Sequence, residues 1–98
     1  MKRELLSAEE VQEGLSGLDW TLDGTHLRKT LTFADFRAAM AFVNRVADLA
    51  EDRNHHPDIA ISWNRVDLRL TTHDRGGLTD WDFDLARAVE ALGPGGEG

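Results

Sequence analysis

Residues 59–71 alternate between apolar and polar side chains, and this period of two constrains the fold more than any other feature. Two alternating runs flank a turn near Asn64, and their apolar positions are Ile59, Ile61, Trp63, Val66, Leu68 and Leu70. Successive side chains of a strand point to opposite faces of a sheet, so each run predicts a strand with one buried face. The segment therefore predicts an antiparallel hairpin with one apolar side.

A second hairpin is predicted upstream, where Asp23-Gly24 separates the short runs 20–22 and 26–31. This dipeptide is typical of tight turns between antiparallel strands.

Three segments carry the same helix-start signal, a Ser or Thr followed three residues later by an acidic residue. The pairs are Ser7 with Glu10, Thr32 with Asp35, and Thr79 with Asp82. Each pair resembles a capping box, in which two side chains satisfy the free backbone N–H groups of a helix start. They predict helices over residues 8–14, 33–52 and 80–92, of which the first ends in a glycine-rich stretch.

The predicted order of elements is helix, hairpin, helix, hairpin, helix. The simplest architecture is an α+β domain in which a four-stranded antiparallel sheet carries three helices packed on one face. The length suits one domain, predicted over residues 1–93, and the glycine-rich residues 94–98 are predicted to form a disordered tail.

The charge balance limits the partners of the chain. Eighteen acidic residues against 11 basic ones give a net charge of −7, which argues against a nucleic-acid partner. The chain has no cysteine, so disulfides, thiolate catalysis and cysteine zinc sites are excluded. No apolar run approaches the roughly 20 residues of a membrane span, and the first residues lack a signal-peptide pattern. A cytoplasmic protein that does not contact membranes is expected.

Polar side chains gather where the middle helix gives way to the second hairpin. Glu51 and His55 are four residues apart, and they share a helix face if the helix extends that far. His56 precedes Pro57, which favours extended backbone there, and His73 follows the strand predicted over residues 65–72. A single surface histidine is ordinarily solvated, but three histidines at element ends near one hairpin favour a site.

The residues alone leave two chemistries open. Histidine and glutamate are competent ligands of zinc or iron, although adjacent side chains such as His55 and His56 usually point apart and chelate one ion poorly. Metal-free proton transfer is the alternative, because histidine, with an unperturbed pKa near 6.5, is both an acid and a base at neutral pH.

The spacing of this segment is distinctive. It reads Glu51, three residues, His55-His56-Pro57, five residues, Trp63, nine residues, His73, eight residues, Asp82. This pattern resembles the signature of the pterin-4a-carbinolamine dehydratases. Trp20, the segment around Phe33 and residues 43–46 are also similar to that family, so the resemblance covers most of the chain.

The resemblance implies a dehydratase that converts 4a-hydroxytetrahydropterin to quinonoid dihydropterin and water, without a metal or an organic cofactor. By this resemblance His55, His56 and His73 are the catalytic residues. His55 and His73 would transfer protons, and His56 would chiefly bind and orient the pterin. Glu51 would hold or polarise a histidine through its other ring nitrogen.

Three further residues complete the predicted site. The backbone around Thr71 and Thr72 would meet the polar edge of the pterin. Asp82 belongs to the family pattern, yet it is also the third helical residue of the last capping box, and a structural cap is the favoured interpretation.

The rival hypothesis is a non-enzymatic role, because some members of that family act as binding partners or assembly factors. In the middle helix, one stripe is predicted to face the core: Phe36, Met40, Val43, Ala47 and Ala50. Phe42, Val46 and Leu49 widen the apolar surface beyond what one sheet covers. These three residues predict a protein interface, and a homodimer or homotetramer is favoured over a foreign protein partner.

Overall fold

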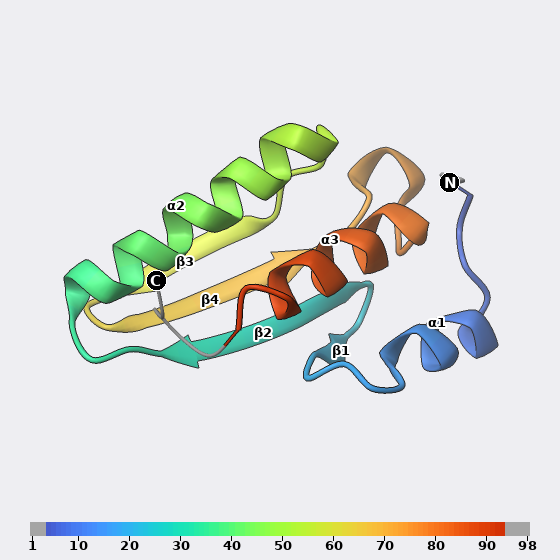
Figure 1. Ribbon diagram of the computed structural model, residues 1–98. Helices are drawn as coiled ribbons and strands as arrows, with labels where there is room; N and C mark the ends of the chain where they lie inside the picture. The colour runs from blue at the N-terminus through green and yellow to red at the C-terminus, as the bar shows by residue number, and fades with distance from the viewer. Residues whose placement is uncertain (1–3, 94–98) are drawn as a thin grey trace.

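The structure, a computed structural model, describes residues 4–93 and consists of a sheet with helices packed against it (Figure 1). The elements are α1 (Ala8–Leu15), β1 (Thr21–Asp23), β2 (His26–Thr32), α2 (Phe36–Arg53), β3 (Asp58–Ser62), β4 (Arg65–Leu70), the 3₁₀ turn η1 (His73–Arg75) and α3 (Asp80–Glu90). The predicted α+β class is confirmed, with one four-stranded antiparallel sheet and three α-helices. The tail predicted for residues 94–98 lies outside the described residues.

The sheet has the strand order β1-β2-β4-β3, and every neighbouring pair is antiparallel. The two hairpins meet along β2 and β4, where Leu27 lies opposite Leu70 and Leu31 lies opposite Val66. Residues opposite each other point to the same face of a sheet, so both central strands direct their leucines and valine toward the helices. This pairing also brings the start of β2 beside the end of β4.

The core lies between the sheet and the helices α2 and α3, which run along one face, while α1 lies beside β1 at the end of the sheet (Figure 1). The alternation predicted for β4 is confirmed, because Val66, Leu68 and Leu70 are fully buried.

The first helix includes Gly14 and does not end there. A Cβ at Gly14 would lie 2.6 Å from the Phe83 ring of α3, so glycine permits this close approach of the two helices.

Two of the three predicted capping boxes are confirmed. In α1 the Ser7 N–H donates to the Glu10 carboxylate at 2.9 Å, and the Ser7 hydroxyl accepts from the Glu10 N–H at 3.1 Å. The same reciprocal arrangement joins Thr79 and Asp82 at the start of α3. These local signals placed both helix starts correctly, because they depend on four consecutive residues only.

The third capping box, predicted at the start of the middle helix, is wrong. Thr32 is the last residue of β2, and Asp35 is itself the N-cap, since its carboxylate accepts from the Ala38 N–H at 2.8 Å. The helix therefore begins three residues later than predicted. Phe33, predicted to be helical, is a buried loop residue whose N–H donates to the Asn64 carbonyl at 2.8 Å.

The buried face of α2 also differs from the prediction. Phe42 and Val46, assigned to a protein interface, are buried, whereas Phe36 is half exposed and Ala47 is exposed. Two apolar stripes overlap on this helix, and its packing over the sheet selects the stripe that contains Ala39, Phe42, Val46 and Ala50. Self-association stays a prediction, but Phe42 and Val46 no longer support it, because they are buried in the core of the chain. No helix in the described part of the chain is long and apolar enough to cross a membrane.

The turns of both hairpins are shifted relative to the predictions. Trp63, predicted as a strand residue, lies in the turn between β3 and β4 with a φ of 52° and is 68 % exposed. Ile59 of the edge strand β3 is also exposed rather than buried. In the first hairpin the turn falls on Gly24 and Thr25, and the positive φ of 61° at Gly24 explains why glycine is suited to this position.

Candidate active site

Three histidines line one cavity at the end of the sheet where α2 and β4 both finish. The cavity has a volume of about 290 Å³ and is lined by Asn54, His55, His56, Thr71, His73 and Asp74. The segment after α2 leads directly into β3, and Asp58 at the start of β3 pairs with Arg69 near the end of β4. The antiparallel register therefore brings together two segments that are distant in sequence.

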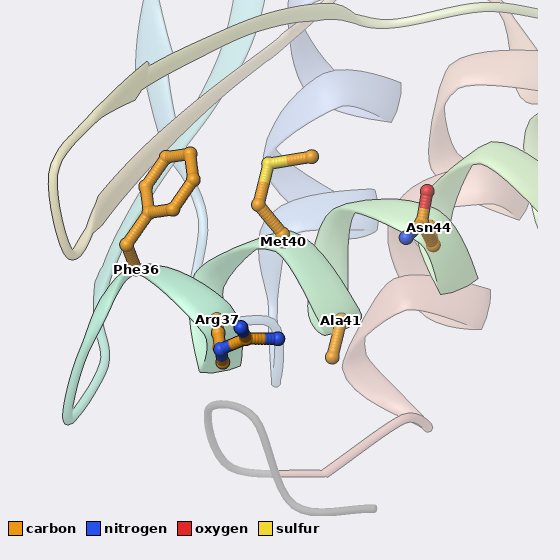
Figure 2. A pocket seen from close by; sticks show the side chains of 5 residues that line it. All are labelled: Phe36, Arg37, Met40, Ala41 and Asn44. Atoms are coloured by element: carbon orange, nitrogen blue, oxygen red, sulfur yellow. The ribbon is translucent and has the colours of Figure 1, made fainter.

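A larger hollow of about 500 Å³ lies on the outer side of α2. Figure 2 shows its lining by Phe36, Arg37, Met40, Ala41 and Asn44. Arg37 is its single ionisable side chain, and an arginine stays protonated at neutral pH, so it cannot serve as a proton acceptor. The hollow on α2 is larger, but the smaller histidine cavity has the side chains that can transfer protons. The histidine cavity is therefore the candidate active site.

His55 is held at the end of α2 by its backbone and by its ring. Asn54 ends the helix in the left-handed conformation, with a φ of 49°, and the His55 N–H donates to the Ala50 carbonyl at 3.1 Å. The imidazole is 7 % exposed, and its Nε2 lies 2.6 Å from Oδ1 of Asp82. A carboxylate only accepts hydrogen bonds, so the hydrogen of this contact belongs to Nε2, and Nδ1 is left for other chemistry.

Asp82 combines the expected cap with a contact that the sequence did not reveal. It is fully buried, and its Oδ2 accepts from the Thr79 N–H at 2.9 Å, as in a capping box. Its other oxygen, Oδ1, is the partner of His55. The negative carboxylate also lies in the first turn of α3, where the helix dipole stabilises negative charge.

His56 pairs with Glu51, so the histidine that Glu51 contacts is not His55, with which it would share a face of a longer helix. The His56 Nε2 lies 2.5 Å from the Glu51 carboxylate. The helical i, i+4 register does not reach His55, because α2 ends at Arg53 and Asn54 reverses the backbone. The two side chains of the His56–Glu51 pair are 54 % and 76 % exposed, so water surrounds it.

His73 enters the site from the second of these segments, as the first residue of η1 just after β4. It is exposed, and its ring meets the edge of the His26 ring with 6.3 Å between the centroids. The strand predicted to run to residue 72 ends at Leu70, and the Thr71 hydroxyl donates to the Thr25 carbonyl at 2.7 Å. This bond joins the residue that follows β4 to the turn of the first hairpin.

The backbone of Thr72 has hydrogen-bond partners within the chain, and its contact with the pterin stays a prediction. Its backbone N–H donates to the Gly77 carbonyl, and its own carbonyl accepts from Arg75 and Gly76. The residue is fully buried, and its hydroxyl lies 2.8 Å from Oδ2 of Asp82. Thr71 thus belongs to the cavity wall, whereas Thr72 contacts the carboxylate that holds His55.

A charged network occupies the open face of the sheet and contains none of the cavity residues. Burial alone would raise the pKa of Asp67, but hydrogen bonds from Arg28 and Thr30, both 2.9 Å, and the positive charges of Arg28 and Arg69 lower it overall. The hydrogen bond and the charge of Asp67 in turn raise the pKa of Arg28. This network joins β2 to β4. Because it lies apart from the cavity, substitutions in it can serve as controls for substitutions at the site.

The cavity residues that sequence reasoning missed are Asn54 and Asp74, and His26 was missed as the neighbour of His73. Asparagine is favoured at left-handed helix ends, so its position before the histidine pair was a usable signal for Asn54. His26 depends on the pairing of β2 with β4, which no local pattern specifies. The ring centroid of Trp81 lies 6.2 Å from that of His55.

The arrangement offers three imidazoles around one space, and two of them are paired with carboxylates. Such groups donate and accept protons near neutral pH. Within residues 4–93, no group of three or more His, Asp or Glu side chains is arranged to hold a metal ion.

Comparison with known proteins connects this geometry to one family. The family model described as "Pterin 4 alpha carbinolamine dehydratase" matches residues 4–92. Two similar proteins bear the name "Putative pterin-4-alpha-carbinolamine dehydratase". One, from Acidobacterium capsulatum, is 53% identical over 89% of this chain and 96% of its own length. The other, from a Nostoc species, is 50% identical over 91% of this chain and 97% of its own length.

Two solved structures share the fold. The crystal structure of a "transcriptional coactivator/pterin dehydratase" from Brucella melitensis has a TM-score of 0.85 and 36% identity, covering 91% of this chain and 98% of that one. A pterin dehydratase-like protein described as a RuBisCO assembly factor of the alpha-carboxysome has a TM-score of 0.62, covering 76% of this chain and 87% of that one. At 24% identity the second likeness shows the fold alone.

Proposed function

The chain belongs to the pterin 4 alpha carbinolamine dehydratase family, and from this premise we propose that it is a hydro-lyase acting on 4a-hydroxytetrahydropterin. The products are quinonoid dihydropterin and water. The observation that carries the proposal is the convergence of His55, His56 and His73 on one cavity, although they come from two segments of the chain. The family resemblance supplies the substrate class, and the cavity supplies groups suited to the reaction.

The reaction requires two proton transfers and no change of oxidation state. A base removes the proton from N5 of the pterin, and the released electron pair forms the double bond between N5 and C4a. The bond from C4a to its hydroxyl oxygen breaks, and an acid protonates the departing hydroxyl as water. Since one proton is taken up and one is given, the enzyme needs two groups in opposite protonation states, as histidines provide.

In this proposal His55 and His73 make the two transfers. His55 uses Nδ1, since its Nε2 hydrogen is held by Asp82 at 2.6 Å. His73 is exposed, so it exchanges protons with water between turnovers. His56, which is exposed and paired with Glu51, binds and orients the pterin, and Thr71 contributes to the wall of the cavity.

The test is the rate of dehydration of a synthetic 4a-hydroxytetrahydropterin, measured against buffer alone. Replacing His55 or His73 by alanine is expected to lower kcat by on the order of 10²-fold or more, the usual scale of acid/base catalysis. Phe36→Ala, in the larger hollow on α2, is the control and is expected to leave kcat within about twofold. A wild-type rate no faster than buffer would contradict the proposal, and it would favour a non-enzymatic role instead.

A further inference from the structure

We infer that Thr72 is a positioning residue for the dehydration, acting on His55 through a one-way chain of hydrogen bonds that runs from Thr79 to Thr72 to Asp82. This inference rests on the proposed function, and it assigns Thr72 a role different from contact with the pterin.

The direction of the chain follows from the number of hydrogens that each group carries. A threonine hydroxyl has one hydrogen, whereas a carboxylate has none to give. At the 2.8 Å contact with Oδ2 of Asp82, the hydrogen must therefore come from Thr72. At the 2.8 Å contact between the two threonine hydroxyls, the hydrogen must then come from Thr79.

Thr79 starts the chain because it also caps α3. Its hydroxyl oxygen accepts from the Trp81 N–H at 3.2 Å, while its hydrogen is donated to Thr72. A hydroxyl that accepts one hydrogen bond is polarised to donate another more strongly. The start of α3 is in this way connected to the imidazole of His55 through three hydrogen bonds: Thr79 to Thr72, Thr72 to Asp82, and Asp82 with His55.

Burial makes the chain specific. Thr72, Thr79 and Asp82 are fully buried, and His55 is 7 % exposed. Oδ2 of Asp82 receives two donors, the Thr72 hydroxyl and the Thr79 N–H, and these fix the carboxylate so that Oδ1 faces Nε2 of His55. With the Thr72 hydroxyl removed, one buried acceptor site loses its donor and the carboxylate can turn. His55 would then lose its fixed tautomer.

The test compares Thr72→Val, which removes the hydroxyl at nearly constant volume, with Thr72→Ser, which restores it. Thr72→Val is expected to lower kcat by about tenfold, the effect of losing one hydrogen bond, with KM for the pterin within about twofold. Thr72→Ser is expected to recover most of this loss. Thr30→Val is the control: it removes a 2.9 Å bond from an exposed threonine to Asp67 on the open face of the sheet, and it should leave kcat unchanged.

A second readout separates this inference from the proposed function. Nitrogen-15 NMR of the histidine rings is expected to show a single Nε2–H tautomer for His55 in the wild type, in Thr72→Ser and in Thr30→Val. Thr72→Val is expected to show a mixture of tautomers and faster exchange of the ring hydrogen. This spectrum is informative even if the wild type has no dehydratase activity, in which case only the catalytic part of the account fails.

Two results would overturn the inference. The first is a Thr72→Val protein with the wild-type His55 spectrum and, where the wild type is active, the wild-type kcat. The second needs no variant and applies even if Thr72→Val does not fold. Buried hydroxyl hydrogens of Thr72 and Thr79 should exchange slowly in the wild type, so their rapid exchange with water would exclude the closed chain.

Discussion

The neighbouring residues His55 and His56 form nearly identical contacts in opposite surroundings. The nitrogen–oxygen distances are 2.6 Å to Asp82 and 2.5 Å to Glu51. The first pair is 7 % and 0 % exposed, whereas the second is 54 % and 76 % exposed. The contact distance therefore says little about the free energy that a pair contributes. The surrounding groups decide whether water and salt compete with the contact between the two side chains.

The difference in burial between the two pairs fits the different roles proposed for His55 and His56. Asp82 is held by Thr72 and Thr79, so the ring of His55 has one orientation and one tautomer. A proton-transfer group needs such a fixed geometry. His56 and Glu51 lie in water, where side chains adjust cheaply, and this suits a group that receives and orients a substrate.

Among changes to the carboxylates of the two pairs, the larger effect is expected from Asp82→Asn, which breaks the buried pair while keeping its shape. An amide has one oxygen, and if this oxygen keeps the Thr72 and Thr79 donors, the NH₂ group faces His55 and forces the Nδ1–H tautomer. We expect kcat to fall by on the order of 10²-fold, since the same exchange next to a catalytic histidine costs up to about 10⁴-fold in serine proteases. Steady-state kinetics and histidine NMR measure both effects.

Asp84→Asn is the matched control for this change, because Asp84 is on the same helix and pairs with Arg53 at 2.9 Å rather than with a histidine. We expect its kcat to stay within about twofold of the wild type. Equal losses in the two variants would show that the helix, and not the contact with His55, is responsible.

A smaller effect is expected from Glu51→Gln in the exposed pair. Exposed ion pairs contribute about 0–1 kcal/mol, so kcat/KM should change by less than about fivefold. At 1 M salt, where the screening length is about 3 Å, the difference from the wild type should disappear, whereas the deficit of Asp82→Asn should persist. A loss for Glu51→Gln as large as that for Asp82→Asn would remove the distinction between the pairs.

The sequence predicted those features of the fold that depend on short segments. The alternation of Val66, Leu68 and Leu70 and the capping boxes at Ser7 and Thr79 each involve neighbours in the chain, and all are confirmed. The start of α2 was predicted incorrectly, because both Thr32 and Asp35 are good capping residues and only the length of β2 decides between them.

The site was predicted as a set of residues but not as a set of contacts. The family-like spacing brought Glu51, His55, His56 and His73 to attention, and the three histidines do line one cavity. The contact of His55 with Asp82 spans 27 residues and depends on how α3 packs against the end of α2. Helical spacing placed Glu51 beside His55 only if the helix continued, but α2 ends at Arg53 and Glu51 contacts His56.

The most direct measurement is a crystal structure of the protein with a bound dihydropterin. The account predicts that the pterin ring lies in the cavity of His55, His56 and His73, with Nδ1 of His55 toward the ring and Nε2 still bonded to Asp82. A pterin bound elsewhere, such as in the hollow beside Phe36 and Met40, would contradict the site. A pterin bonded to Nε2 of His55 in place of Asp82 would contradict the role given to the buried pair.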